Sequence, residues 1–243
     1  MHFHVGTSGY SYKEWKGSFY PGKLPAKEML GYYAGRFRTV EINSTFYRMP
    51  TAAVLESWAG QVPADFRFVL KAPQDLTHRK RLKDAGELLS SLVGVAGVLR
   101  ERLGPLLFQL PPTFGRDVPR LRAFLAAVPL RTRAAFEFRH ASWFDDEVFG
   151  VLRDHNAALC VADADDDLEV PFAATADWGY LRLRRVEYSD AALASWADRM
   201  RGQNWTDAFA FFKHEDAGTG PKLATRLLEL LGEEEGTKGK RPA

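Results

Sequence analysis

Short apolar runs alternate with longer amphipathic runs along almost the whole chain. Short runs bounded by turn residues predict strands, and runs with apolar residues every three or four positions predict helices. Strands are expected at residues 3–8, 39–43, 66–72, 105–111, 133–139, 157–163, 179–185 and 208–214. Helices are expected at residues 25–37, 51–60, 84–103, 119–128, 143–156, 190–200 and 220–231. Only the sixth strand lacks a clear helix after it.

Strands that alternate with helices pair in parallel, because each connection must return to the same end of the sheet. Eight such units in 243 residues match the size of a (β/α)8 barrel, the TIM barrel. We therefore predict one barrel domain over residues 1–231, with the helix after strand six short or missing. A doubly wound open sheet is the alternative, but GTSGYS after the first strand lacks the G-x-G-x-x-G spacing of a dinucleotide site.

Composition and charge indicate the cellular compartment but do not indicate a binding partner. Apolar residues make up 46% of the chain, which is enough for a large core, and the net charge of +2 gives no electrostatic case for nucleic acid or membrane. A single cysteine, Cys160, excludes an intrachain disulfide and fits a reducing cytoplasm. We expect no signal peptide and no membrane span. Residues 232–243 are charged and rich in glycine, and are expected to form a disordered tail.

The stretch AFEFR at residues 135–139 places a carboxylate and a guanidinium in an otherwise apolar strand. In a barrel, one face of each strand packs against the helices and the other points inward. Phe136 and Phe138 suit the helix side, so Glu137 and Arg139 are expected to point into the barrel near the carboxyl end of the strand. Barrel enzymes build their active sites at that end.

The same alternation assigns polar inward positions on other strands. The mouth of the barrel is expected to collect Glu41, Asn43, Lys71, Gln109, Glu137, Arg139, Asp163, Arg182 and Arg184. Strand eight adds either Lys213 or His214, since its alternation is ambiguous. One interpretation is a salt-bridged plug. A functional site is favoured, because buried charges are costly unless they pair, and pairing alone is often no better than an apolar plug.

The first loop, residues 8–25, is long for its type, and long loops are often functional. It interleaves aromatic residues with lysines, an arrangement that suits a stacked base or sugar. The alternative is that these rings pack down as a lid on the barrel. Further candidates for substrate binding are Tyr10, Trp15, His78, His140 and Trp143.

Five sequence blocks resemble the signature blocks of the YecE-like family, the domain-of-unknown-function family numbered 72. They are GTSGYSYKEWKGSFYP, VEINSTFYRMP, GPLLFQLPPTF, EFRHASW and TADWGYLRLR. The resemblance extends from Gly6 to about Leu231 and implies a barrel of the TIM type, with no established activity. The usual family pattern has asparagines after the last strand and a histidine and a glycine near strand seven. Here those places hold Lys213 and His214, and Arg184 and Arg185.

Metal and cofactor chemistry is not expected. The pair His2-x-His4 lies at the amino end of strand one, away from the mouth. A second possible ligand set is Glu41, Glu137, His140, Asp163 and His214. It shows no tight ligand spacing, and the cations around it would repel a divalent metal. A divalent metal at the mouth therefore remains only the weaker alternative.

Acid–base chemistry and anion binding are better supported. Glu41 and Glu137 lie on non-adjacent strands and could face each other across a ligand, with pKa values set apart by their surroundings. Lys71 is either a Schiff-base nucleophile or the ion-pair partner of Glu41. Guanidinium groups match phosphate and carboxylate, so Arg139, Arg182 and Arg184 with Lys71 would bind an anion.

We therefore predict an enzyme that acts on a small, polar, anionic substrate at the carboxyl mouth of the barrel. Its expected catalytic residues are Glu41, Glu137 and Lys71, with the remaining mouth residues binding substrate. The alternative is a nucleic-acid-binding or nucleic-acid-processing protein that uses the first loop and the basic mouth. A binding module without catalysis is also open, and the sequence does not indicate an oligomeric state.

Overall fold

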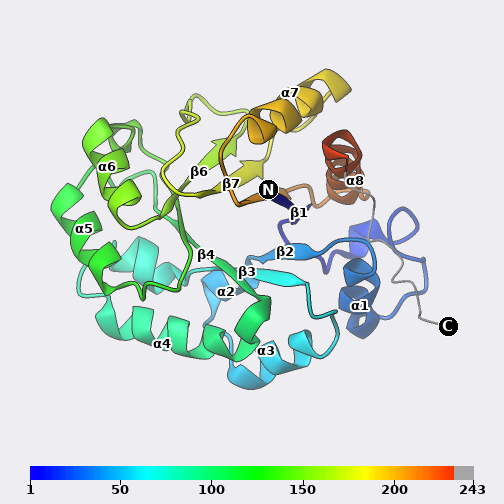
Figure 1. The fold of residues 1–243 in the computed structure, drawn as a ribbon. Coiled ribbons are helices and arrows are strands. Elements are labelled where there is room, and N and C mark those ends of the chain that lie inside the picture. The colour runs from blue at the N-terminus through cyan, green and yellow to red at the C-terminus, as the bar shows by residue number, and fades with distance from the viewer. Residues whose placement is uncertain (233–243) are drawn as a thin grey trace.

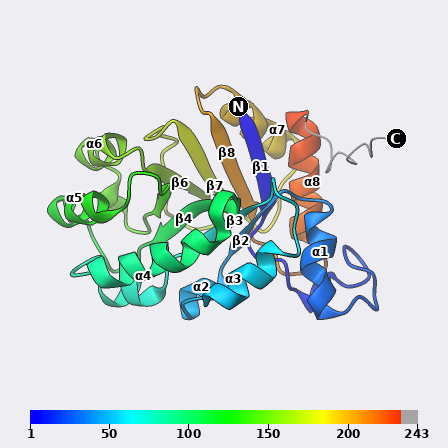
Figure 2. The same cartoon turned by 60° about the horizontal axis from the view of Figure 1, so that its bottom comes forward.

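A computed structural model describes residues 1–232 of the chain and contains one sheet of eight parallel strands. The strands are β1 (His2–Thr7), β2 (Thr39–Ile42), β3 (Arg67–Lys71), β4 (Leu103–Gln109), β5 (Ala134–Glu137), β6 (Ala158–Asp163), β7 (Trp178–Leu183) and β8 (Asp207–Phe212). Their order, β1-β8-β7-β6-β5-β4-β3-β2, follows the chain around a barrel. The predicted (β/α)8 fold is confirmed, and Figures 1 and 2 show the helices arranged outside the strands.

The helices alternate with the strands, as the periodicity predicted. They are α1 (Met29–Ala34), α2 (Ser44–Tyr47), α3 (Ala52–Ala59), α4 (Gly86–Ala96), α5 (Val118–Ala127), α6 (Asp146–Asp154), α7 (Asp190–Arg201) and α8 (Thr219–Leu231). Residues 164–177, between β6 and β7, contain no helix, which agrees with the missing pattern there. The tail predicted for residues 232–243 lies outside the described residues, apart from Gly232, which caps α8 in the left-handed conformation with φ 77°.

Side-chain caps explain where several helices begin. Thr51, Asp117, Asp145 and Ser189 each accept a hydrogen bond from a backbone N–H in the first turn of the following helix. Such caps satisfy donors that the helix itself leaves free. Helix positions were therefore predictable to within a few residues. The long helix expected at 84–103 instead ends at Ala96 and continues as a 3-10 turn, in which Arg100 has φ 51°.

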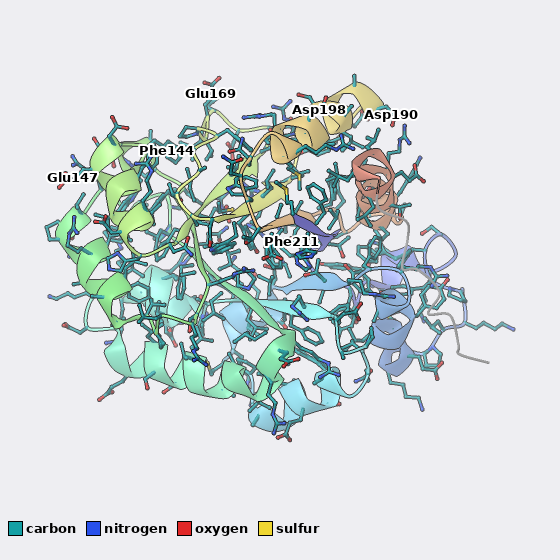
Figure 3. All side chains as sticks on the ribbon, viewed as in Figure 1. Phe144, Glu147, Glu169, Asp190, Asp198 and Phe211 are labelled. Atoms are coloured by element: carbon teal, nitrogen blue, oxygen red, sulfur yellow. The ribbon has the colours of Figure 1, made fainter. Side chains whose placement is uncertain are left out.

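Two separate apolar layers result from the alternation along the strands. Inside the barrel lie Val69, Leu107, Ala135, Ala158, Cys160, Trp178, Tyr180, Phe209 and Phe211. The other face of each strand packs under the helices, where Phe136 stacks on Phe108 at 5.3 Å between ring centroids. Figure 3 shows Phe211 near the middle of the molecule and Glu147 and Asp190 at its edge. The inner layer fills the barrel below the mouth, and the polar residues lie above it.

The barrel closes between β1 and β2 through a tyrosine hydroxyl and only a single bridge, between Ser8 and Glu41. Tyr33 Oη accepts a hydrogen bond from the backbone N–H of Thr7 at 2.9 Å and donates one to the carbonyl oxygen of Thr39 at 3.0 Å. A Cβ at Gly6 would lie 2.3 Å from that same carbonyl oxygen, so glycine is required there. This join holds Glu41 in place next to the first loop.

Candidate functional site

A buried arginine joins two buried glutamates near the carboxyl ends of the strands. Arg182 on β7 donates from Nη1 to Glu137 Oε2 at 2.5 Å and from Nη2 to Glu41 Oε1 at 2.9 Å. The three side chains come from β7, β5 and β2, and none is more than 2% exposed. The arginine therefore places one positive charge between two carboxylates that are almost fully buried.

Glu41 is held on every side. Its Oε1 also accepts a hydrogen bond from Ser8 Oγ at 2.6 Å, and its Oε2 accepts one from Tyr180 Oη at 2.6 Å. Both carboxylate oxygens are thus engaged by side chains of β7 and the first loop. Since both oxygens are engaged and the side chain is 0% exposed, Glu41 is suited to fixing Arg182 and has no free face to offer a ligand.

The hydrogen-bond chain continues from Glu137 to Lys71. Gln109 donates from Nε2 to Glu137 Oε2 at 2.8 Å and accepts at Oε1 from Lys71 Nζ, also at 2.8 Å. The amide can be oriented only one way, because the ammonium group is a donor and the carboxylate an acceptor. Side chains of β3, β4, β5, β7 and β2 are therefore linked in one row across the barrel.

Lys71 does not form the ion pair with Glu41 that the sequence left open. Within residues 1–232, no carboxylate oxygen lies within 4.0 Å of its Nζ, and Glu41 is paired with Arg182 instead. The Lys71 ammonium lies 4.1 Å from the centroid of the Phe46 ring and is 9% exposed. This amine is nearly buried, and within residues 1–232 its side-chain hydrogen-bond partner is a neutral amide.

A cavity of about 370 Å³ lies above this row. Its lining consists of Tyr12, Asn43, Ser44, Tyr47, Lys71, Gln109, Arg139, Arg182, Arg184, Lys213 and Glu215. Arg139 and Arg184 approach Glu137 Oε1 at 3.7 Å and 3.8 Å, and both approach Asp166 at about the same range. These contacts exceed hydrogen-bond distance, so both guanidinium groups keep N–H donors for another acceptor.

Several buried polar atoms at this end of the barrel have no hydrogen-bond partner within residues 1–232. They are Nδ2 and Oδ1 of Asn43, Oε1 of Glu137, and Nε of Arg182 and of Arg184. Buried polar groups are nearly always paired, since leaving one unpaired costs free energy. Their concentration around one cavity indicates a place that a polar ligand or water completes.

The charges set two unusual pKa values. Burial alone would raise the pKa of Glu137, but the guanidinium groups of Arg182, Arg184 and Arg139 outweigh it and lower the pKa to about 2. Burial, and then the charge of Arg182, lowers the pKa of Lys71 to about 8. Glu137 is therefore a permanent anion at neutral pH, whereas Lys71 can release its proton near neutral pH.

Asp163 does not face the mouth, although it was expected there, and neither does His214, one of the two alternatives for strand eight. Asp163 accepts hydrogen bonds from Arg185 Nε at 2.6 Å, Tyr188 Oη at 3.0 Å and Trp196 Nε1 at 3.2 Å. Leu159 and Val161 precede it on the helix-facing side of β6, so strict alternation would have placed it outside. His214 bonds the Arg185 carbonyl oxygen, and Lys213 is the strand-eight residue that lines the cavity.

The aromatic candidates form structure around the site instead of lining it. Trp15 is 0% exposed and packs beside Tyr12 and Phe19, while Tyr10 lies against Tyr33. The first loop therefore folds its rings inward, as the lid alternative described.

Trp143, the other buried tryptophan of the candidates, stacks on Phe138 and donates to the Phe114 carbonyl oxygen at 2.7 Å. His140 is exposed and accepts a hydrogen bond from the Ser142 N–H at 3.2 Å, which starts a 3-10 turn. His78 lies edge-on to Phe46, one layer behind Lys71. These three residues position the loops after β3 and β5.

Sequence reasoning missed Tyr12, Ser44, Tyr47 and Glu215, which all line the cavity. Ser44 and Tyr47 follow β2 directly in α2, a helix of only four residues that the periodicity could not show. Tyr47 is 74% exposed although it is a large aromatic residue, and that exposure is visible only in the structure. Polar or aromatic residues just after a barrel strand were the available signal.

Two further features concern the possible metal ligands and the length of the helices. Among residues 1–232, no three His, Cys, Asp or Glu side chains gather as ligands for a metal ion would. His2 and His4 lie beside Asp207 at the amino end of the barrel, with His4 Nε2 3.1 Å from its carboxylate. None of the helices in the described part of the chain is both long and apolar enough to cross a membrane.

Comparison with known proteins places this barrel in a family. The model of the family described as "Protein of unknown function DUF72" matches residues 4–243. The chain belongs to the DUF72 family. A DUF72 protein from Thermotoga maritima (TM1631) has a similar structure, with 28% sequence identity and a TM-score of 0.85 over 96% of this chain and 100% of that one. The Enterococcus faecalis DUF72 protein EF0366, 18% identical with a TM-score of 0.82 over 99% of this chain and 100% of that one, shares the fold.

Curated relatives of this DUF72 chain are similar over shorter stretches. UPF0759 protein YecE of Escherichia coli K12 is 35% identical over 113 residues, which are 46% of this chain and 42% of YecE. UPF0759 protein YunF of Bacillus subtilis 168 is 29% identical over 153 residues, 58% of this chain and 52% of YunF. The chain thus spans about half the length of the curated relatives it matches. The names of these relatives state no activity.

Proposed function

We propose that this DUF72 protein is an enzyme that binds a small phosphate-bearing or carboxylate-bearing substrate in the cavity at the carboxyl mouth of its barrel. The observation that carries the proposal is the pair Arg139 and Arg184, whose closest carboxylate oxygens lie 3.7–4.0 Å away. Planar guanidinium groups with free donors suit a phosphate or carboxylate. The cavity, about 370 Å³, has room for a small metabolite.

The other cations of the cavity support the same substrate charge. Lys213 lines the cavity and, within residues 1–232, has no carboxylate oxygen within 4.0 Å. Lys71 likewise has no carboxylate oxygen within 4.0 Å among the described residues; its Nζ donates to Gln109 and lies over the ring of Phe46. An anion bound here would gain from four cations whose charges are not fully used by the protein.

The proposed roles differ from those first expected for the glutamates. Glu41 accepts bonds from Ser8, Tyr180 and Arg182, so it fixes the arginine and does not transfer a proton. Glu137, with its pKa lowered to about 2, is a fixed negative charge below the cavity that orients Arg182 and the amide of Gln109. Proton transfer falls to Lys71, whose pKa of about 8 is close to neutral pH.

No observation favours the nucleic-acid alternative. Trp15 and Tyr20 of the first loop are buried, with exposures of 0% and 1%, so their faces are taken by neighbouring rings. Stacking of bases needs exposed aromatic faces. Tyr47 alone presents an exposed ring at the cavity, and one ring suits a small substrate.

The test is isothermal calorimetry with inorganic phosphate and a panel of phosphate monoesters and short carboxylates. A charge-assisted hydrogen bond contributes roughly 1.5–3 kcal/mol, so Arg184→Gln should weaken binding about tenfold or more. Arg122→Gln is the matched control, because Arg122 is an exposed arginine that pairs with Asp154 on the outer helices. The proposal fails if wild type binds no anion at millimolar concentration, or if both variants bind as wild type does.

A further inference from the structure

We infer that Lys71 is a covalent nucleophile, and that the substrate is a small anionic aldehyde or ketone with which its amine forms an imine. This inference rests on the proposed function, since the anionic group of the substrate is held by the arginines described above. The inference names the reactive group of each partner. The protein supplies the amine of Lys71 on β3, and the substrate supplies a carbonyl carbon in the cavity.

The first support is the way Lys71 is held. Its Nζ donates to Gln109 Oε1 at 2.8 Å and lies 4.1 Å from the Phe46 ring centroid. Within the described residues it has no carboxylate at ion-pair distance, so no salt bridge must break before the amine reacts. A lysine kept only for charge balance would be expected to contact Glu137 directly. Here an amide separates the two.

The second support is the electrostatic environment. Lys71 shares the cavity wall with Arg139, Arg182, Arg184 and Lys213. Burial and the charge of Arg182 lower the pKa of Lys71 from 10.5 to about 8, so the fraction of neutral amine at neutral pH rises roughly 300-fold over an exposed lysine. Desolvation next to other cations is a recognised way of activating a lysine nucleophile.

The third support is an unpartnered amide in the same wall. Asn43 follows β2 and lines the cavity, and neither its Nδ2 nor its Oδ1 has a hydrogen-bond partner within residues 1–232. Both atoms are buried in this structure, and a rotation of the side chain would bring the Nδ2–H into the cavity as a donor for the carbonyl oxygen of a substrate. Negative charge develops on that oxygen when the amine attacks, and such a donor stabilises it.

Imine formation between Lys71 and the substrate carbonyl needs no further reagent. The nitrogen lone pair of the neutral amine attacks the carbonyl carbon, the N–C bond forms, and the π electrons of the carbonyl move to its oxygen. Both hydrogens of the amine pass to that oxygen, which leaves as water when the C=N bond forms. Nothing is oxidised or reduced, and hydrolysis by the reverse steps restores the lysine.

The experiment is reductive trapping. The full chain is incubated at pH 7 with glyoxylate or glycolaldehyde phosphate and sodium cyanoborohydride, and its mass and peptide map are then measured. We expect one adduct per chain on the peptide that contains Lys71, formed at least tenfold faster than on surface lysines. Excess inorganic phosphate should slow it, and uncharged glycolaldehyde should label Lys71 far less.

Two variants complete the test. Lys71→Arg should lose the specific adduct, whereas Lys27→Arg, at an exposed lysine in the 3-10 turn before α1 and away from the cavity, should keep it. Adducts spread over surface lysines with no preference for Lys71 in wild type would overturn the inference, and this measurement does not depend on how the variant folds. Phosphate binding without trapping would reject the imine and leave the proposed function standing. Trapping that phosphate does not slow would reject the anion site.

Discussion

Replacing Arg182 by glutamine should strongly destabilise the protein at neutral pH. The arginine is 2% exposed and is the only cation that hydrogen-bonds Glu41 and Glu137 within residues 1–232. Its removal leaves Glu41 with only hydroxyl donors, and leaves Glu137 with the two more distant guanidinium groups of Arg139 and Arg184. Removing one member of a buried ion pair typically costs about 3–5 kcal/mol.

The lowered pKa of Glu137 gives a second measure of how strongly the nearby cations stabilise its charged carboxylate. Its cations lower the pKa from an ordinary value of 4.5 to about 2 against the effect of burial. A shift of that size corresponds to about 3 kcal/mol of preference for the charged form in the folded state. Because the pKa is lowered, this stability is present above pH 4.5 and is lost as the pH falls towards 2.

The assay is urea unfolding followed by circular dichroism at pH 7 and at pH 5. We expect Arg182→Gln to lose about 3–5 kcal/mol at pH 7 and less at pH 5, because burial then raises the pKa of Glu137 against only Arg184 and Arg139, and acid neutralises the carboxylate more readily. The control Arg122→Gln breaks an exposed pair and should cost about 0–1 kcal/mol at both values. A loss below about 1 kcal/mol for Arg182→Gln, or an equal loss at both pH values, would refute this reasoning.

Three further predictions test other parts of the structure. Tyr33→Phe should cost about 1–3 kcal/mol in urea unfolding, because the buried Thr7 N–H and Thr39 carbonyl lose their partner; an unchanged midpoint would show that the hydroxyl does not join β1 to β2. Cys160 should be unreactive towards a thiol reagent in the native protein and reactive in urea, since burial raises the pKa of its thiol; rapid native labelling would contradict its place inside the barrel. Sulfate, whose charge is constant, should bind more weakly as the pH rises through about 8 and Lys71 loses its proton; affinity that does not change from pH 6.5 to 9.5 would exclude Lys71 from the anion site.

The sequence predicted the barrel and much of its mouth because both follow from period-two alternation. Phe136 and Glu137 point to opposite faces of β5 whatever they contact, so alternation alone placed Glu137 and Arg182 inside. The prediction failed for Asp163, which was placed inside because it is polar. Alternation puts it on the outer face of β6, the same face as Leu159 and Val161. The same alternation would have chosen Lys213 over His214, since Phe209 and Phe211 face the interior.

Pairing could not be predicted, because it depends on distances across the barrel. The sequence left Lys71 as either a nucleophile or the ion-pair partner of Glu41 on the neighbouring strand. In the structure Arg182 from β7 pairs with Glu41, and Lys71 contacts Gln109 instead. The sequence also left two roles for the aromatic rings of the first loop, a lid on the barrel or a surface on which a base or sugar stacks. The burial of Trp15 favours the lid. Alternation gives the direction of a side chain, and only coordinates give its neighbour.

The most direct test of the anion site is a crystal structure of the protein grown with millimolar phosphate. We expect one phosphate in the cavity, with oxygens within hydrogen-bond distance of Arg139 and Arg184. Phosphate bound elsewhere on the molecule, with this cavity holding water alone and both arginines turned towards Asp166, would contradict it.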